Sequence, residues 1–230
     1  MAQSALTPEY SDEFVTIYHG DCIDVMRYIP GGSVTTVITD IPYGAVNRES
    51  NGLRTMDKGA ADDVTFALDE STQEAIRIVS GSIYIFCGTE QVSDIRAALV
   101  EAGLSTRLCV WEKSNPSPMN GEYIWLSSVE CCVFGKKAGA TFNEFCKSPV
   151  WRHKNGQAKE HPTEKPLNLM RYLVRVSTNP GDTVLDPCAG SGTTLLAAAQ
   201  EGRRAVGIEL DRAYCGLAAR RVSSVQGVLL

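Results

Sequence analysis

Short apolar runs rich in β-branched residues alternate along the chain with amphipathic segments of helical period. The apolar runs predict seven strands, at 14–19, 34–39, 82–87, 106–111, 128–134, 183–186 and 205–209. The amphipathic segments predict helices at 22–28, 71–79, 91–102, 167–177, 191–200 and 212–222. Strands that alternate with helices are typical of an α/β protein with a mainly parallel sheet.

Two of the predicted strands, 106–111 and 128–134, have no predicted helix between them. The residues that follow the first of them, Ser114-Asn115-Pro116-Ser117-Pro118, are turn formers. We therefore expect an antiparallel pair at one edge of the sheet. Two polar stretches, 44–63 and 136–160, contain no predicted element, and loops of this length in a compact domain are usually functional or disordered.

The chain is long enough to bury one substantial core, since 43% of its 230 residues are hydrophobic. No shift in composition divides it, so we expect a single domain over residues 1–230. Its formal net charge of -5 argues against a protein that binds nucleic acid over its whole surface, because phosphate contacts require Lys and Arg. Any surface for an anionic partner must be local.

None of the eight cysteines is spaced as Cys-x-x-Cys, and most lie in apolar, strand-like stretches. We expect buried free thiols and no metal site. Residues 1–13 are polar, and no apolar run is long enough to cross a bilayer. These features predict a cytoplasmic protein with no membrane partner.

A glycine turn joins a predicted strand to a predicted helix at Asp186-Pro187-Cys188-Ala189-Gly190-Ser191-Gly192-Thr193-Thr194. Glycine lets a ligand approach the backbone, and the N–H groups of the helix start face it. Glu209 ends the next strand, 19 residues after Gly190, where a carboxylate can accept hydrogen bonds from ribose hydroxyls. A tight structural turn explains a bare Gly-x-Gly equally well. Leu195 stands where a dinucleotide fingerprint needs Gly or Ala, and no P-loop lysine is present.

A second motif, His161-Pro162-Thr163-Glu164-Lys165-Pro166, precedes the predicted helix at 167–177. Thr163 and Lys165 offer a hydroxyl and a cation, which suit a carboxylate. A lone Lys-Pro pair would indicate only a helix start.

The glycine turn closely resembles the S-adenosylmethionine loop of amino-methyltransferases that act on DNA. Asp40-Ile41-Pro42-Tyr43 resembles the Asp-Pro-Pro-Tyr signature of N6-adenine and N4-cytosine methyltransferases, with Ile41 in place of the first proline. The catalytic motif comes first and the cofactor loop last, as in the β group of that family. The resemblance implies a Rossmann-like α/β methyltransferase fold with a circularly permuted motif order, a catalytic half at 14–135 and a cofactor half at 161–222.

The resemblance also implies S-adenosylmethionine as the cofactor, S-adenosylhomocysteine as its product, and no metal. Asp21 would meet the adenine amino group of the cofactor, although a role as a helix cap is an equal alternative. The cofactor residues implied are Asp21, Cys22, Asp40, His161, Thr163, Lys165, Asp186, Pro187, Cys188, Ala189, Gly190, Ser191, Gly192, Thr193, Glu209 and Leu210.

Catalysis must overcome the delocalised lone pair of an exocyclic amine. The Asp40 carboxylate and the main-chain carbonyl of Ile41 can each accept one amino hydrogen, while Pro42 restrains the residue before it. Direct in-line transfer can follow. Tyr43 would stack on a target base rotated out of the duplex. Taken alone, the tetrapeptide is also compatible with an ordinary strand exit and a core tyrosine.

Residues 136–175 hold nine basic and three acidic side chains. A solvated face is the usual meaning of such a run, but interleaved aromatic residues favour DNA contacts. The family places target recognition at about 136–160, and 44–63 is a second candidate that could equally be a flexible loop. The DNA-binding residues predicted are Arg48, Arg54, Lys58, Lys113, Lys136, Lys137, Lys147, Trp151, Arg152, His153 and Lys154.

The resemblance therefore implies a site-specific adenine-N6 methyltransferase of double-stranded DNA, because Asp rather than Ser opens the catalytic tetrapeptide, which is a tendency of the adenine enzymes within the family. Cytosine-N4 methylation is the runner-up, and a catalytically idle module that binds cofactor and DNA is a third hypothesis. A nicotinamide oxidoreductase ranks below these. The short recognition interval leaves open a small target sequence, a homodimer or weak specificity.

Overall fold

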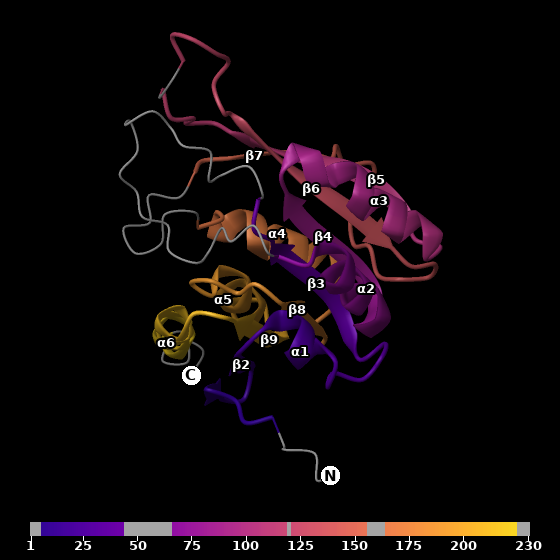
Figure 1. The fold of residues 1–230 in the computed structure, drawn as a ribbon, viewed down its shortest axis with the longest axis vertical. Helices are drawn as coiled ribbons and strands as arrows, with labels where there is room; N and C mark the ends of the chain where they lie inside the picture. Colours follow the sequence, from indigo (N-terminus) through magenta and orange to yellow (C-terminus); the bar gives the residue numbers. More distant parts are fainter. Residues whose placement is uncertain (1–5, 44–65, 119–120, 156–163, 225–230) are drawn as a thin grey trace.

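The computed structural model describes residues 6–43, 66–118, 121–155 and 164–224, and these residues form one nine-stranded sheet (Figure 1). The strand order is β1-β2-β9-β8-β3-β4-β6-β5-β7. In chain order the strands are β1 (Tyr10–Ser11), β2 (Val15–His19), β3 (Val34–Asp40), β4 (Val79–Cys87), β5 (Ser105–Lys113), β6 (Val129–Lys136), β7 (Val150–His153), β8 (Thr183–Asp186) and β9 (Arg204–Glu209).

Helices cover both faces of the sheet, because its central strands are apolar on both sides. Val37 and Ile38 of β3 show this, since they are fully buried in two different cores. One core contains α4 (Leu167–Ser177), α5 (Thr193–Gln200) and α6 (Arg212–Ser223). The other contains α1 (Cys22–Met26), α2 (Leu68–Ile78) and α3 (Val92–Glu101), the last preceded by the short helix η2 (Thr89–Gln91).

All seven predicted strands are present, but the predicted strand count is two too low. The short β1 pairs antiparallel with β2, and β7 pairs parallel with β5. The antiparallel pair β5–β6 is therefore not at the edge, because β7 lies outside it. β7 was missed because it has only four residues, set among polar and basic neighbours that give no apolar run. Six predicted helices are also confirmed, with shifted ends at all but α4.

The carboxyl ends of the parallel strands all lie on the same side of the sheet. We call this row of strand ends, as distinct from the outermost strands, the catalytic edge. β6 runs antiparallel to β4 and β5, so it begins where they end. β3 of the catalytic half lies directly beside β8 of the cofactor half, with Val37 opposite Leu185. Crevices at such a reversal of strand order are the usual ligand sites of open α/β sheets.

All eight cysteines are free thiols in the structure, and five of them are buried: Cys22, Cys87, Cys109, Cys132 and Cys215. Within the part of the chain that the structure describes, no helix combines the length and apolar character needed to cross a membrane.

Candidate active site

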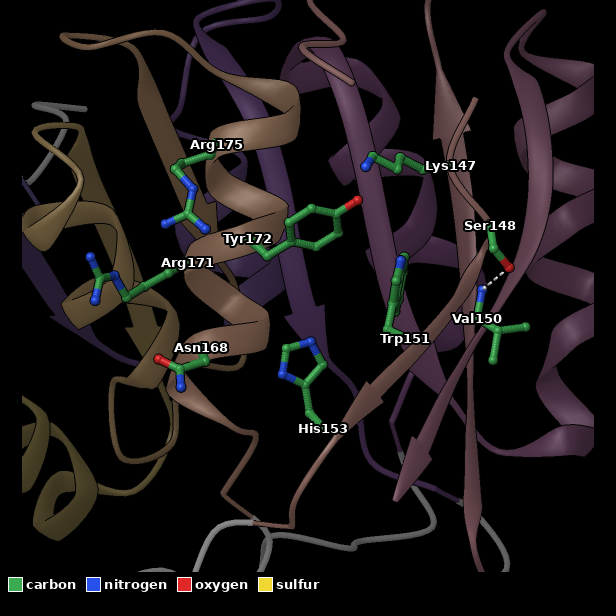
Figure 2. A pocket seen from close by; sticks show the side chains of 9 residues that line it. All are labelled: Lys147, Ser148, Val150, Trp151, His153, Asn168, Arg171, Tyr172 and Arg175. Carbon is green, nitrogen blue, oxygen red and sulfur yellow. Dashed lines mark hydrogen bonds between the residues drawn. The ribbon is translucent and has the colours of Figure 1, made fainter. Parts of the chain in front are cut away.

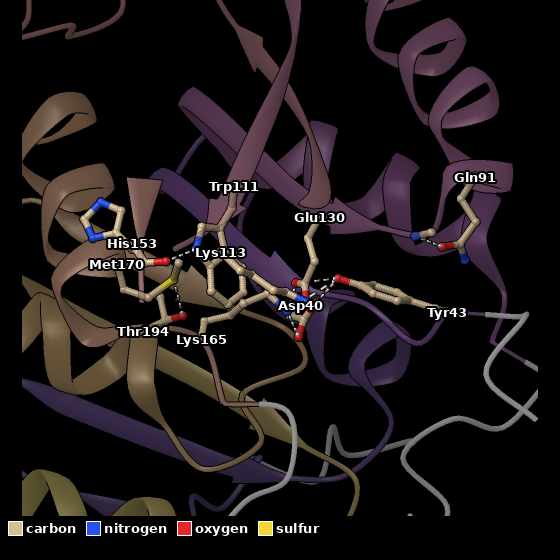
Figure 3. A network of polar contacts seen from close by, with 11 residues as sticks. Asp40, Tyr43, Gln91, Trp111, Lys113, Glu130, His153, Lys165, Met170 and Thr194 are labelled. Carbon is tan, nitrogen blue, oxygen red and sulfur yellow. Dashed lines mark hydrogen bonds and ion pairs between the residues drawn. The ribbon is translucent and has the colours of Figure 1, made fainter. Parts of the chain in front are cut away.

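Asp40 stands at the end of β3, with a hydrogen-bond donor on each of its carboxylate oxygens (Figure 3). The hydroxyl of Tyr43 donates to Oδ1 at 2.8 Å, and the Lys165 ammonium donates to Oδ2 at 2.5 Å. Both partners of this carboxylate belong to motifs that the sequence analysis singled out. The structure thus brings the catalytic tetrapeptide and Lys165 together across 125 residues of chain.

Glu130, the second residue of β6, extends this contact into a network of four charges. Its Oε2 lies 3.0 Å from Lys165 Nζ, and its Oε1 lies 2.8 Å from Lys113 Nζ. Two carboxylates and two ammonium groups therefore alternate from Asp40 to Lys113. Because the Lys165 side chain is only 8% exposed, removing one partner would leave charge unpaired in a poorly hydrated place.

Aromatic rings enclose the Lys165 ammonium. Its Nζ lies 5.4 Å from the centroid of Phe86, 5.6 Å from that of Tyr43 and 6.0 Å from that of Trp111. The faces of these rings attract a cation, so they help to hold the charged amine in place.

The network has different effects on the pKa values of its members. Desolvation raises the pKa of Asp40, and the attraction of Lys165 offsets this only in part, since Glu130 opposes it. For Glu130, burial also acts to raise the pKa, but Lys165 and Lys113 outweigh it and the pKa falls. For Lys165, burial acts to lower the pKa, but Asp40 and Glu130 raise it above its ordinary value. Asp40 is thus the carboxylate of the network that gains a proton more readily.

The backbone after Asp40 is fixed by its neighbours. The Ile41 N–H donates to the Phe86 carbonyl at 3.2 Å, and the Gln91 amide donates to the Pro42 carbonyl at 3.0 Å. The Gln91 Oε1 in turn accepts the Gly88 N–H at 2.9 Å. Ile41 is 4% exposed, so an apolar side chain fits where the family signature has proline. Gln91 holds the tetrapeptide in place, a role the sequence analysis missed.

The glycine turn between β8 and α5 has the left-handed backbone expected of it, with φ of 50° at Gly190 and 78° at Gly192. The Gly190 N–H donates to Glu209 Oε2 at 2.7 Å, and Glu209 Oε1 accepts the Asp211 N–H at 2.9 Å. The turn and the end of β9 are therefore joined through one carboxylate. A Cβ at Gly192 would lie 2.8 Å from the Cβ of Ala218, so close packing of α6 also requires glycine there.

Residues 164 and 165 connect the two halves of the site. Glu164 accepts a hydrogen bond of 2.9 Å from the Thr193 hydroxyl at the start of α5 and forms an ion pair with Arg221. Arg221 also donates to the Ser191 carbonyl at 2.8 Å. The next residue, Lys165, bonds Asp40. One step along the chain thus leads from the glycine turn to the catalytic carboxylate, so both lie close together at the catalytic edge.

Asp186 ends β8 with its side chain buried, at 4% exposure. Its Oδ1 accepts the Cys188 N–H at 3.1 Å, but desolvation dominates and raises its pKa to about 7. The thiols of Cys188 and Cys22 interact, which brings the start of α1 against the glycine turn. The turn residues Pro187, Ala189 and Ser191 are buried.

Asp21 caps α1, which is the role that the sequence analysis gave as the alternative to a contact with the cofactor. Its Oδ1 accepts the N–H groups of Ile23 at 2.9 Å and Asp24 at 3.2 Å. Leu210, which follows Glu209, has a side chain that is 61% exposed, and its carbonyl is 3.1 Å from His19 Nε2. The carboxylates of Asp21 and Glu209 accept hydrogen bonds, and the exposed Leu210 side chain offers an apolar contact. Together with the glycine turn, these groups suit a nucleoside with ribose hydroxyls.

Lys165 has two partners that the sequence analysis did not predict. In the structure it bonds Asp40 and Glu130, and its predicted contact with the carboxylate of a cofactor stays a prediction. The sequence could not show this, because both partners come from distant strands. His161 and Thr163, the other predicted cofactor residues of this motif, lie outside the described residues.

The predicted DNA-binding residues are spread over three regions. Lys113 lies at the catalytic edge but turns inward to Glu130. Lys136 and Lys137 lie at the opposite edge, where β6 ends, and Lys137 Nζ bonds the carbonyls of Ile76 and Val79. Lys113 and Lys137 therefore make structural contacts, while Lys136 Nζ lies 3.4 Å from the carbonyl of the adjacent Lys137. Arg48, Arg54 and Lys58 lie outside the described residues.

Trp151 was predicted to contact DNA, but it belongs to the core. Its ring is 8% exposed and lies 6.3 Å from that of Tyr84 and 6.2 Å from that of Phe86. Alternation along β7 explains this, since Trp151 points inward while Arg152 points outward. Arg152 is exposed and bonds Glu112 at 2.8 Å, and Lys154 is exposed as well.

A basic groove of about 590 Å³ lies between β7 and α4 (Figure 2). Lys147 and His153 line one side, and Arg171 and Arg175 of α4 line the other. Both arginines bond the same oxygen of Glu201 at 2.7 Å, which offsets part of their charge. His153 ends β7, so it lies at the end of the groove that faces the catalytic edge.

Several site residues carried a weak sequence signal or none. Glu130 is a charge at the start of an otherwise apolar strand, which is a detectable anomaly. Glu164 lies inside a motif that was recognised, but its contact with Thr193 depends on the fold. Gln91 and Arg221 have no signal in the sequence, since only their positions at the site give them a role.

Comparison with known proteins identifies the family of this chain. A family model for N6 and N4 enzymes, described as DNA methylase, matches residues 122–220. The putative methylase YubD of Escherichia coli (strain K12) is 33% identical over 210 residues, covering 90% of this chain and 89% of its own. The DNA adenine methyltransferase YhdJ of the same strain is 27% identical over 250 residues, covering 93% and 84%.

The fold has a counterpart among solved structures. The crystal structure of M1.HpyAVI in complex with SAM superposes with a TM-score of 0.73 and 29% identity, covering 90% of this chain and 98% of that one. The methyltransferase fold expected from the sequence is thereby confirmed. YubD matches this chain over nearly the whole length of both proteins, and the family model matches it as well. This chain therefore belongs to the N6/N4 DNA methylase family.

Proposed function

We propose that this protein transfers a methyl group from S-adenosylmethionine to adenine N6 at specific sites in double-stranded DNA. One observation carries the proposal. The Asp40 carboxylate and the glycine turn lie close together at the catalytic edge, linked by contacts of the adjacent residues Glu164 and Lys165. An amine held by Asp40 therefore lies near whatever the turn binds.

Glu209, the turn at Gly190 and Asp21 would hold the cofactor. The M1.HpyAVI complex with SAM supports the identity of that cofactor. Glu209 keeps acceptor capacity for ribose hydroxyls, because a carboxylate has about four lone-pair sites and the backbone N–H groups of Gly190, Leu210 and Asp211 use about three of them. When bound, S-adenosylmethionine supplies an electrophilic methyl group on a sulfonium.

Asp40 would activate the amine by accepting one of its hydrogens, and the Ile41 carbonyl would accept the other. Tyr43 and Lys165 already donate to the two oxygens of Asp40, but each oxygen has a second lone pair. The amine can therefore bind without displacing them. Lys165 favours the ionised form of Asp40, which the interaction requires.

The methylated nitrogen initially carries one proton more than the product. Asp40 is the base beside it, and its raised pKa suits a group that accepts this proton and returns it to solvent. Glu130 and Lys165 remain paired with each other throughout.

Tyr43 would contact the flipped target base, since the amine cannot be reached within the stack. Its hydroxyl is anchored on Asp40 at 2.8 Å, so its ring borders the place where the amine must lie. Arg152, Lys154 and His153 supply phosphate contacts in this proposal, and Lys147 lines the adjoining groove. A homodimer is one way to enlarge this small recognition surface.

Adenine is preferred to cytosine because Asp opens the tetrapeptide and because YhdJ is named a DNA adenine methyltransferase. Cytosine N4 is the second candidate, since the matching family model covers both types of enzyme. An idle module that binds cofactor and DNA is the third. A complete network around Asp40 argues against it.

The test is to incubate the purified protein with radiolabelled S-adenosylmethionine and unmethylated genomic DNA. Digestion to nucleosides and mass spectrometry then identifies the product. We expect N6-methyladenine. N4-methylcytosine would establish the second candidate, and binding of both ligands without transfer would establish the idle module.

A further inference from the structure

The connection between β5 and β6 exposes an unusual run of large apolar side chains. Trp125 is 95% exposed, Tyr123 is 84% exposed and Ile124 is 68% exposed. The other two tryptophans of the chain, Trp111 and Trp151, are 1% and 8% exposed. Figure 1 shows this connection standing away from the sheet and its helices at the top of the view. We call residues 121–126 the aromatic loop.

The aromatic loop lies at the catalytic edge. β5 ends there and β6 begins there, and the Lys113 N–H donates to the Ser128 carbonyl at 2.7 Å to close the pair. Glu130, which pairs with Lys165 beside Asp40, follows two residues after Ser128. The loop is thus tied to the strand that carries part of the catalytic network.

The loop has local structure that leaves Trp125 outside. The Gly121 N–H donates to the Pro118 carbonyl at 3.0 Å, and the Ser128 N–H donates to the Leu126 carbonyl at 2.7 Å. A Cβ at Gly121 would lie 2.6 Å from Leu126 Cδ2, so Leu126 folds back over Gly121. Neighbouring Trp125 points to solvent, with no such apolar cover.

We infer that the aromatic loop is a wedge for duplex DNA, in which Trp125 enters the base stack where the target base has been flipped out. This inference rests on the proposed function. Flipping leaves a gap in the stack and an unpaired partner base, and an aromatic ring can fill that gap by stacking on bases of any sequence. A wedge must lie at the edge that receives the target base, as this loop does.

Charge at the same edge favours DNA as the occupant. β7 runs parallel to β5, so its end places exposed Arg152 and Lys154 beside the end of β5. These cations can contact phosphates on either side of an inserted ring. A second copy of this chain is the competing occupant, and the experiment separates the two.

The first experiment compares Trp125→Ala with Trp125→Phe and with Tyr28→Ala. Tyr28 is 57% exposed but lies between the end of α1 and the start of β3, at the opposite edge. Each variant is assayed for methyl transfer into unmethylated genomic DNA, as duplex and after heat denaturation. We expect Trp125→Ala to lower kcat/KM on the duplex by about 10-fold or more, with little change on denatured DNA. Trp125→Phe should retain most activity, and Tyr28→Ala should match the parent protein.

The second experiment reads Trp125 directly, because the other two tryptophans are shielded. Duplex DNA should reduce acrylamide quenching of the protein fluorescence, and Trp125→Ala should remove that effect. Equal duplex activity of Trp125→Ala and parent, with quenching unchanged by DNA, would overturn the inference. Conversion of a dimer to a monomer by Trp125→Ala in sedimentation would overturn it in favour of a second copy. If the parent methylates neither DNA, the proposed function fails, and quenching alone decides whether Trp125 meets DNA.

Discussion

The two sides of the site are built in different ways. The catalytic side is a set of side chains from distant parts of the chain, in which Asp40, Glu130 and Lys165 meet through ion pairs. The cofactor side is a local backbone turn, in which Gly190 and Gly192 adopt left-handed conformations and one carboxylate, Glu209, holds the turn to β9.

This difference predicts how each side fails when it is changed. On the catalytic side a substitution leaves other charges unpaired, so it changes pKa values and rates. On the cofactor side a substitution changes the shape of a turn, so it changes affinity. Glu164 and Lys165 join the two sides, but their contacts are separate, one to each side. Binding and transfer should therefore be separable by mutation.

The largest effect on affinity is expected from Gly190→Val. A β-branched residue is strained at a φ of 50°, and its side chain would stand where the turn must approach its ligand. We expect affinity for S-adenosylhomocysteine, measured by calorimetry, to fall by about 100-fold or more. Gly103→Val is the matched control, because Gly103 has a φ of 80° with nothing within 4 Å of a Cβ and lies away from the site. Equal affinity in the Gly190 variant and the parent would show that the turn does not bind the cofactor.

A smaller effect, on rate and pH dependence, is expected from Glu130→Gln. Glu130 is a positioning residue, because it acts on Asp40 through Lys165 and through its own charge. Without that negative charge, and with Lys165 paired to Asp40 alone, the pKa of Asp40 should fall. The acid limb of kcat/KM should then move to lower pH, and the maximal rate should fall by about 10-fold.

Glu101→Gln, an exposed change on α3, serves as the control for Glu130→Gln. Affinity for S-adenosylhomocysteine should stay within about 2-fold of the parent, since Glu130 lies on the catalytic side. An acid limb that does not move, or moves to higher pH, would contradict the assignment of Glu130.

The smallest effect is expected on stability, from Asp186→Asn. Burial raises the pKa of Asp186 to about 7 in the folded protein, from an ordinary value near 3.8. Between these values the unfolded chain loses its proton while the folded protein keeps it, so this residue costs stability as pH rises through that range. Asparagine stays neutral. The gain in Tm of the variant relative to the parent should therefore grow as pH rises from about 4 to about 7, to on the order of 5 °C or more, and level off above pH 7. A difference in Tm that is constant with pH would contradict the buried, protonated state of Asp186.

The contrast between the two sides also explains what could be predicted from sequence. The glycine turn, Glu209 and the strand that ends in Asp40 are local patterns, and the structure has them where they were expected. The partners of Lys165 could not be predicted, since they lie on β3 and β6 and only the antiparallel course of β6 brings Glu130 to the catalytic edge.

Surface roles were predicted least well. A run of basic and aromatic residues does not show which side chains point outward, and β7 turns Trp151 into the core while it exposes Arg152. Lys137 illustrates the same limit, because it bonds main-chain carbonyls around the end of α2. The exposed aromatic loop carried no predicted role, since its importance depends on which edge of the sheet it occupies.

The most direct test of the central claim is Asp40→Ala with two measurements on the same preparation. If one site holds a methyl donor on its cofactor side and an amine on Asp40, the variant should lose methyl transfer to DNA by about 1,000-fold. Its calorimetric affinity for S-adenosylhomocysteine should stay within about 3-fold of the parent. Retained transfer in the Asp40→Ala variant would contradict the account.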